Sequence, residues 1–124
     1  MSLTAIFNHH QYLNLETFRK NDLGVKTPVW FVEESGTLYV RTYAISGKVK
    51  RIHNNRQVNI APCKVDGTLL GDWIEASARV VDDEEIDRKV DQLLGKKYGL
   101  LKVFFSLASS IQGQKNVIVE IKAV

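Results

Sequence analysis

Short runs of β-branched and aromatic residues, each bounded by polar or turn residues, constrain the fold of this chain more than any other feature. Three of these runs are followed by turns that contain glycine, at residues 21–24, 34–36 and 66–67. Residues 72–81 alternate between two sets of side chains, which is typical of a strand with two different faces. The sequence predicts six strands, at residues 12–18, 25–33, 38–42, 57–65, 72–81 and 117–124.

Helices interrupt this pattern in few places. Ser46 is suited to cap a short helix over residues 47–53, because its hydroxyl can accept a backbone N–H. A second helix is predicted from the acidic residues 82–85 to Gly99, and residues 100–111 are predicted as a further helical stretch. This order favours a mostly β fold with helices: a six-stranded antiparallel barrel forming one domain over residues 1–124.

Length and composition exclude several classes of protein. A chain of 124 residues, 44% of them hydrophobic, can bury the core of one globular domain. Its longest nearly apolar run, residues 100–111, is shorter than the ~20 residues that span a bilayer. No secretory signal pattern is found, and the single Cys63 excludes an internal disulfide and a cysteine-based metal cluster. We therefore expect a cytoplasmic protein with no membrane partner.

The distribution of charge predicts an anionic ligand. The net charge is only +3, but residues 41–64 contain six basic residues and no acid. Within that segment, Lys48 and Arg51 are three residues apart and would project from one face of the predicted helix, beside its free N–H groups. A mononucleotide phosphate fits this pattern better than a pyrophosphate, since no Gly-rich dinucleotide motif is present. The alternative is a solvated basic turn.

A second candidate feature combines residues 27–30 (TPVW) with residues 39–42 (YVRT). If the two segments lie on adjacent strands, a threonine, a backbone interrupted by proline and an arginine come close together. Pro28 cannot donate to a sheet ladder, so it should lie at an edge, a bulge or a cofactor. The alternative is a core hairpin with polar surface residues.

No catalytic residue is identified. The sequence lacks a Ser-His-Asp pattern, an HExxH motif and paired carboxylates in a supporting context, and its adjacent His9 and His10 would point different ways on a helix. No metal site is expected. If the protein is an enzyme, a cofactor supplies the chemistry.

In order and spacing, these motifs resemble the pyridoxamine 5′-phosphate oxidase-like split β-barrel superfamily. The resemblance covers about residues 12–99 and includes TPVW, a strand with RT, and GKxxR ahead of the fourth strand. It is similar in particular to the small branch that uses the deazaflavin F420. The additional substrate-phosphate residues of true pyridoxamine 5′-phosphate oxidases are not found, so that activity is not expected.

The resemblance implies a homodimer with a flavin-type cofactor at each of two interface sites, a small-molecule substrate and an oxidoreductase activity that transfers a hydride. FMN is the first choice of cofactor and F420 the alternative. The implied cofactor-binding residues are Thr27, Pro28, Val29, Trp30, Arg41, Thr42, Lys48 and Arg51.

Two other functions stay open. A carrier or sensor that binds FMN or F420 without turnover would share every phosphate-binding residue. A nucleic-acid-binding barrel could use the same basic strip, but the low net charge and the lack of an aromatic ladder disfavour it.

Overall fold

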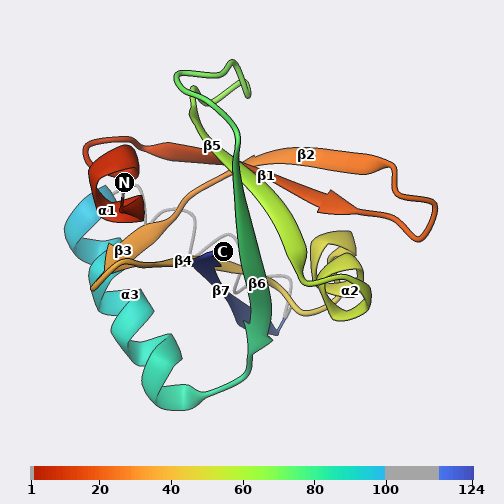
Figure 1. Ribbon diagram of the computed structural model, residues 1–124. Coiled ribbons are helices and arrows are strands. Elements are labelled where there is room, and N and C mark those ends of the chain that lie inside the picture. The colour runs from red at the N-terminus through yellow and green to blue at the C-terminus, as the bar shows by residue number, and fades with distance from the viewer. Residues whose placement is uncertain (1, 100–114) are drawn as a thin grey trace.

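The computed structural model describes residues 2–99 and 115–124, which form one curled antiparallel sheet with helices around it (Figure 1). The order of strands across the sheet is β2-β1-β5-β6-β7-β4-β3. The strands are β1 (Tyr12–Phe18), β2 (Gly24–Val29), β3 (Val32–Glu34), β4 (Thr37–Tyr43), β5 (Gln57–Cys63), β6 (Ile74–Val81) and β7 (Asn116–Ala123). The helices are α1 (Leu3–Phe7), α2 (Gly47–Asn54) and α3 (Glu84–Tyr98).

The sheet curls into a half-barrel, which confirms the predicted fold class. Its two edge strands, β2 and β3, are consecutive in the chain and are joined only by Trp30 and Phe31. The edges must therefore approach each other. The prediction of one strand over residues 25–33 is wrong, because β2 pairs with β1 whereas β3 pairs with β4.

The end of α3 holds the break between β2 and β3. The Phe31 N–H donates to the Tyr98 hydroxyl at 3.0 Å, and the Lys97 ammonium donates to the Phe31 carbonyl at 2.9 Å. The Trp30 ring stacks on Tyr98 with centroids 4.1 Å apart and planes 7° apart. Since α3 takes both backbone polar groups of Phe31, they are satisfied without a sheet ladder.

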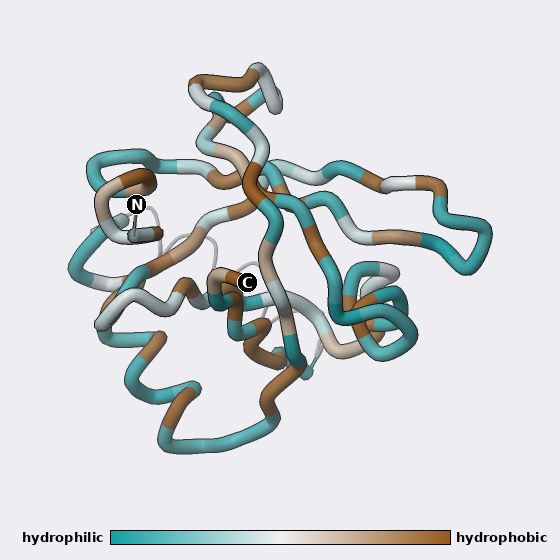
Figure 2. The backbone as a smooth tube through the Cα atoms, viewed as in Figure 1, coloured by the Kyte–Doolittle hydropathy of each residue, from teal (hydrophilic) through white to brown (hydrophobic). Residues whose placement is uncertain are grey.

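Side chains that alternate along the strands divide the core into two parts. The interior of the half-barrel holds one cluster, which includes Leu38, Val40 and Val119. The opposite face of β4 and β7 is covered by α3, and there Tyr39 and Ile118 pack in a second cluster. Because neighbouring residues of a strand point to opposite faces, β7 is buried on both sides. Figure 2 shows the resulting hydrophobic stretch along this strand.

The helices occupy different ends of the sheet. Figure 1 shows α2 below the β1–β2 hairpin, while α1 lies near β3 and the end of α3. Helix α1 was not predicted; Ser2 caps it, and Leu3 and Phe7 are buried. The predicted helix over residues 100–111 lies outside the described residues.

Candidate functional site

Within the cationic segment 41–64, residues 47–54 fold as α2, and Ser46 caps the start of this helix as predicted. The Ser46 backbone is extended (φ −66°, ψ 152°), and its Oγ accepts a hydrogen bond from the Val49 N–H at 3.4 Å. Val49 and Ile52 are buried, so the other side of α2 faces outward. Lys48 and Arg51 are both half-buried on this helix, three residues apart.

Arg51 reaches back to the N-terminus of its own helix. Its Nε donates to Thr17 Oγ1 at 2.6 Å, and Thr17 is fully buried at the end of the core-facing row of β1. A Cβ on Gly47 would lie 2.7 Å from Arg51 Nη1, so the glycine leaves room for the guanidinium beside the first helical turn. The guanidinium therefore lies where unpaired N–H groups already carry partial positive charge.

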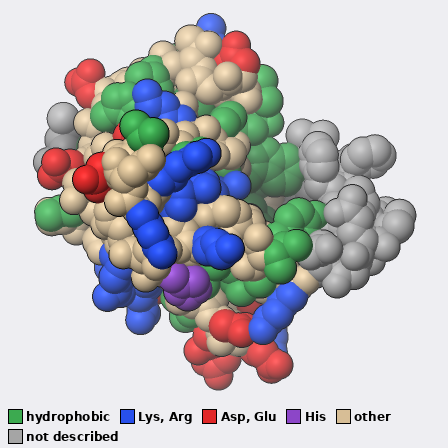
Figure 3. All heavy atoms as spheres, turned by 90° about the vertical axis from the view of Figure 1, so that its right-hand side faces the viewer, with side chains coloured by type: hydrophobic (Ala, Val, Ile, Leu, Met, Phe, Trp, Pro, Cys, Tyr) green, Lys and Arg blue, Asp and Glu red, His purple; other side chains and the backbone are tan. Residues whose placement is uncertain are grey.

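Burial, and then repulsion between neighbouring cations, disfavours the charged forms of Lys48 and Arg51. Burial, and then the nearby Arg51, lower the pKa of Lys48; burial, and then Arg19 of the β1–β2 turn, lower the pKa of Arg51. Among residues 2–99 and 115–124, no ion pair joins Lys48 or Arg51 to a carboxylate. Figure 3 shows Lys and Arg side chains gathered on the face that contains α2 and the hairpin. A bound anion would offset this repulsion.

Of the two predicted residues on β4, only Thr42 lies at this terminus. Thr42 Oγ1 is 3.4 Å from Ser46 Oγ. Arg41 points to the other face of the strand, where its Nη1 donates to Asp91 at 2.9 Å and its Nη2 to Asp87 at 3.2 Å, both on α3. Strand alternation separates the two neighbours, because Thr42 shares the face of Val40 and Arg41 that of Tyr39.

Pro28 lies in an edge strand, one of the positions predicted for it. β2 pairs with β1, and Pro28 stands opposite Asn14 in that ladder. Thr27 and Val29 stand opposite Leu15 and Leu13, on the face toward the barrel interior. Trp30 follows the strand and is held by its stacking on Tyr98 (4.1 Å between centroids).

Residues 27–30 and 39–42 do not lie on adjacent strands, so the condition for the second candidate feature is not met. β2 is the first strand of the sheet order and β4 is the sixth, so no ladder joins them. The predicted strand over residues 25–33 placed TPVW directly before the strand over residues 38–42. The true hairpin partner of β4 is β3.

Two residues near the start of α2 were missed in the sequence. Thr17, which fixes Arg51, lies in a predicted strand and carries no local signal of its contact. Arg19 follows β1, in the connection to β2, and was not singled out. Its positive charge was the one feature of the sequence that could have suggested a role near an anion, but only the fold brings Arg19 close to Arg51.

Comparisons of the sequence with protein-family models and with curated proteins gave no match. Solved structures do match. A candidate pyridoxamine 5′-phosphate oxidase from Listeria innocua is 19% identical, with a TM-score of 0.66 over 96% of this chain and 88% of that one. HutZ, the heme storage protein from Vibrio cholerae, is 16% identical, with a TM-score of 0.73 over 98% of this chain and 87% of that one.

A third solved structure is an F420 reductase, 15% identical, with a TM-score of 0.63 over 98% of this chain and 92% of that one. The chain has the pyridoxamine 5′-phosphate oxidase-like split-barrel fold. This confirms the fold implied by the sequence resemblance. The solved split barrels include proteins named for catalysis and one named for heme storage, so the fold alone leaves the activity of this split barrel open.

Two further findings concern the described residues of the split barrel. None of their helices is long and apolar enough to cross a membrane. Within the same ranges, no group of three or more His, Cys, Asp or Glu side chains could hold a metal ion.

Proposed function

We propose that the protein binds a flavin-type cofactor through its phosphate, with FMN as the first choice and F420 as the alternative. The observation that carries this proposal is the Arg51 guanidinium, which lies beside the first turn of α2 at Gly47 and is fixed there by Thr17. Lys48 supplies a second half-buried cation. Fixed N–H donors and two cations suit a phosphate oxyanion, so the residues present fit the group.

The edge strand β2 is the proposed neighbour of the cofactor ring. One side of β2 pairs with β1, and none of the described strands pairs with its other side. Thr27 and Val29 direct their backbone groups toward β1, in the same alternation as the Arg19 N–H that donates to the Leu23 carbonyl. The outward backbone groups of this edge are therefore those of Lys26 and the carbonyl of Pro28, which can hydrogen-bond a planar heterocycle, while Pro28 has no N–H to donate. Because Arg41 is engaged by α3, we assign it to positioning β4 against that helix rather than to the cofactor.

We further propose a hydride-transferring oxidoreductase acting on a small conjugated substrate. A bound flavin or deazaflavin would supply the two-electron chemistry, so the protein needs only to bind, orient and shield it. The likeness to an F420 reductase and to a candidate oxidase supports this class. A cytoplasmic location is part of the same proposal and suits the free, buried thiol of Cys63.

The proposed assembly is a homodimer. Ile45 is 78% exposed one residue before the cap of α2, and Val65 and Leu70 are exposed on the β5–β6 loop. Figure 2 shows a hydrophobic stretch on that protruding loop. A second copy that covered Ile45 would lie against the phosphate site, as expected if each cofactor contacts both subunits.

The second candidate function is cofactor binding without turnover. The likeness to a heme storage protein favours it, since that split barrel is named for storage. Every residue proposed for the phosphate would serve a carrier or sensor equally well.

Titration of the full chain with FMN and with F420, followed by fluorescence, tests the binding proposal. We expect one of them to bind with a Kd below about 100 µM, which is roughly −5.5 kcal/mol. Failure of both would overturn the cofactor proposal. Reduction of the bound cofactor, followed by mixing with conjugated acceptors, then separates the functions: catalytic reoxidation supports an enzyme, and its absence across the acceptors supports a carrier or sensor.

A further inference from the structure

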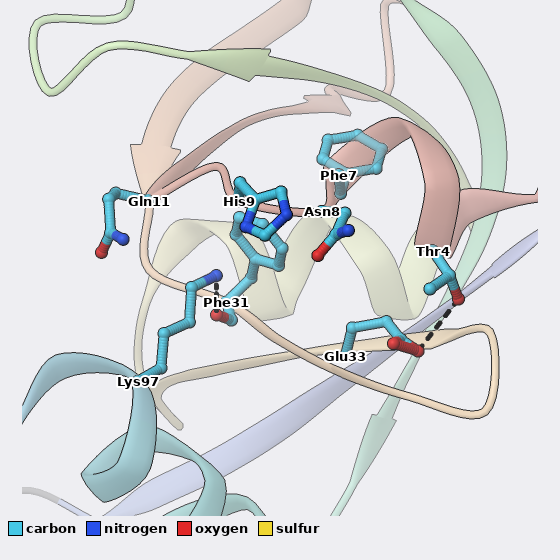
Figure 4. Close-up of a pocket in the computed structure, with 8 residues that line it drawn as sticks. All are labelled: Thr4, Phe7, Asn8, His9, Gln11, Phe31, Glu33 and Lys97. Carbon is cyan, nitrogen blue, oxygen red and sulfur yellow. Dashed lines mark hydrogen bonds between the residues drawn. The ribbon is translucent and has the colours of Figure 1, made fainter.

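A pocket of about 340 Å³ lies away from α2, between α1 with its following turn, β3 and the end of α3 (Figure 4). Its volume is within the ~300–1,000 Å³ that small-molecule sites occupy. Residues of three separate segments line it: Thr4, Phe7, Asn8, His9 and Gln11; Phe31 and Glu33; and Lys97. None of these residues belongs to the proposed phosphate site.

The apolar part of the lining is aromatic. Phe7 and Phe31 are 2% and 1% exposed, and their rings meet edge to face with centroids 5.6 Å apart and planes 76° apart. Both rings are fixed in the core, so they close the inner end of the pocket and expose almost none of their own surface to it.

Lys97 brings a cation to the pocket, beside the Phe31 ring. Its Nζ lies 3.4 Å from the centroid of the Phe31 ring and donates to the Phe31 carbonyl at 2.9 Å. That bond uses one of the three N–H groups of the ammonium. Burial lowers the pKa of Lys97 to about 8, which indicates a cation without a compensating anion. A carboxylate brought by a ligand would provide one.

Glu33 brings the opposite charge to another part of the pocket. Its Oε2 accepts hydrogen bonds from Thr4 Oγ1 at 3.0 Å and from the Gly36 N–H at 3.1 Å, so both bonds use the same oxygen. No ion pair joins Glu33 to Lys97, and Figure 4 shows the two charged ends apart from each other. The pocket therefore presents a separated cation and anion.

We propose that this pocket binds a small zwitterion, with its carboxylate at Lys97 and its ammonium at Glu33. Each end of such a molecule meets a charge of opposite sign. A second carboxylate would face Glu33, so the same geometry rejects dicarboxylates. The site is independent of the proposed cofactor site.

Calorimetric titration of the full chain with four matched benzene derivatives tests the assignment. 4-(Aminomethyl)benzoate carries both charges, benzoate and benzylamine carry one each, and terephthalate carries two carboxylates. We expect 4-(aminomethyl)benzoate to bind best and terephthalate to bind worse than benzoate. If 4-(aminomethyl)benzoate does not bind at about 10 mM, or binds no better than either singly charged compound, the proposal is overturned.

Charge-removing variants assign each end of the ligand. Lys97→Met should weaken 4-(aminomethyl)benzoate and benzoate at least about tenfold, the effect of one charge-assisted hydrogen bond, and should not weaken benzylamine. Glu33→Gln should abolish the preference for 4-(aminomethyl)benzoate over benzoate and should relieve the rejection of terephthalate. Lys96→Met is the matched control, because Lys96 is exposed on the same last turn of α3. Equal losses in Lys96→Met and Lys97→Met would refute the assignment.

The pH dependence of the unmodified protein gives a measurement that does not depend on whether these variants fold. Benzoate affinity should fall between about pH 7 and about pH 9, as Lys97 loses its proton. The other titratable groups around this ammonium are His9, Glu33 and Tyr98. Burial raises the pKa of Tyr98, so its hydroxyl stays neutral over this range. A flat profile would contradict the role of Lys97. A Lys48→Ala/Arg51→Ala variant should bind 4-(aminomethyl)benzoate as the wild type does. This result would show that the pocket is independent of the proposed cofactor site.

Discussion

Replacing Lys48 and Arg51 together by alanine should remove most of the affinity for a phosphate-bearing cofactor. Both side chains are half-buried at the start of α2, and the guanidinium lies beside Gly47. In this position each can form charge-assisted hydrogen bonds to an oxyanion, while the helix N–H groups remain in both proteins.

The size of the loss follows from the two interactions removed. A hydrogen bond to a charged group contributes about 1.5–3 kcal/mol, and partial exposure puts these two toward the low end. We expect a loss of about 2–5 kcal/mol, which lowers affinity by between ~30-fold and several thousand-fold.

Arg51 also has a structural contact, and the design must separate it from binding. Its removal leaves the Thr17 hydroxyl, which is 0% exposed, without the Nε donor at 2.6 Å. An unsatisfied buried polar group destabilises the fold by about 1–3 kcal/mol. In Thr17→Val/Arg51→Ala both partners are gone, so the free energy of unfolding should recover toward that of the wild type while cofactor affinity stays low.

Fluorescence titration with FMN and F420, alongside urea unfolding, measures both quantities. Lys50→Ala is the matched control, since Lys50 is exposed on the same helix and does not share the face of Lys48 and Arg51. Unchanged affinity in the double alanine variant would refute the site. Recovery of affinity in Thr17→Val/Arg51→Ala would show that stability, rather than phosphate contact, had been measured.

Three further predictions concern the site, the pH dependence of folding and the assembly. Gly47→Ala would put a Cβ 2.7 Å from Arg51 Nη1, so the flexible guanidinium should move away from the helix start. Cofactor affinity should fall with little change in the thermal midpoint. Unchanged affinity in a titration would argue against a phosphate held beside Gly47. The pKa of Lys97 is lowered to about 8 in the folded protein, so the folded protein loses this proton at a lower pH than the unfolded chain does. The free energy of unfolding should therefore rise with pH between about 8 and 10.4, by on the order of 1–2 kcal/mol after solvent screening. Urea unfolding across this range should show that rise in the wild type and not in Lys97→Met, and equal slopes would contradict it. Sedimentation of the wild type should find a dimer at micromolar concentration, and Ile45→Glu should weaken this dimer. We expect its interface to bury at least ~1,200 Å². A wild-type monomer would refute the dimer.

The antiparallel strands and the start of α2 could be predicted from the sequence because their signals are local. Period-two alternation and glycine turns define most of the strands, and Ser46 followed by a helical segment defines the cap. The phosphate candidates Lys48 and Arg51 followed from helical spacing, which places residues three apart on one face whatever surrounds them.

The sequence alone determined that this chain would form short antiparallel strands and carry a cationic helix start, because both depend on residues a few positions apart. Only the tertiary structure decided how those strands pair. Tyr98, from a helix 67 residues further along, takes the Phe31 N–H and so separates one apparent strand into β2 and β3. The same long-range packing turns Arg41 toward α3, brings Thr17 to Arg51, and encloses Lys97 and Glu33 in one pocket. Contacts of this kind join residues that no local pattern relates, since they depend on how the whole sheet curls.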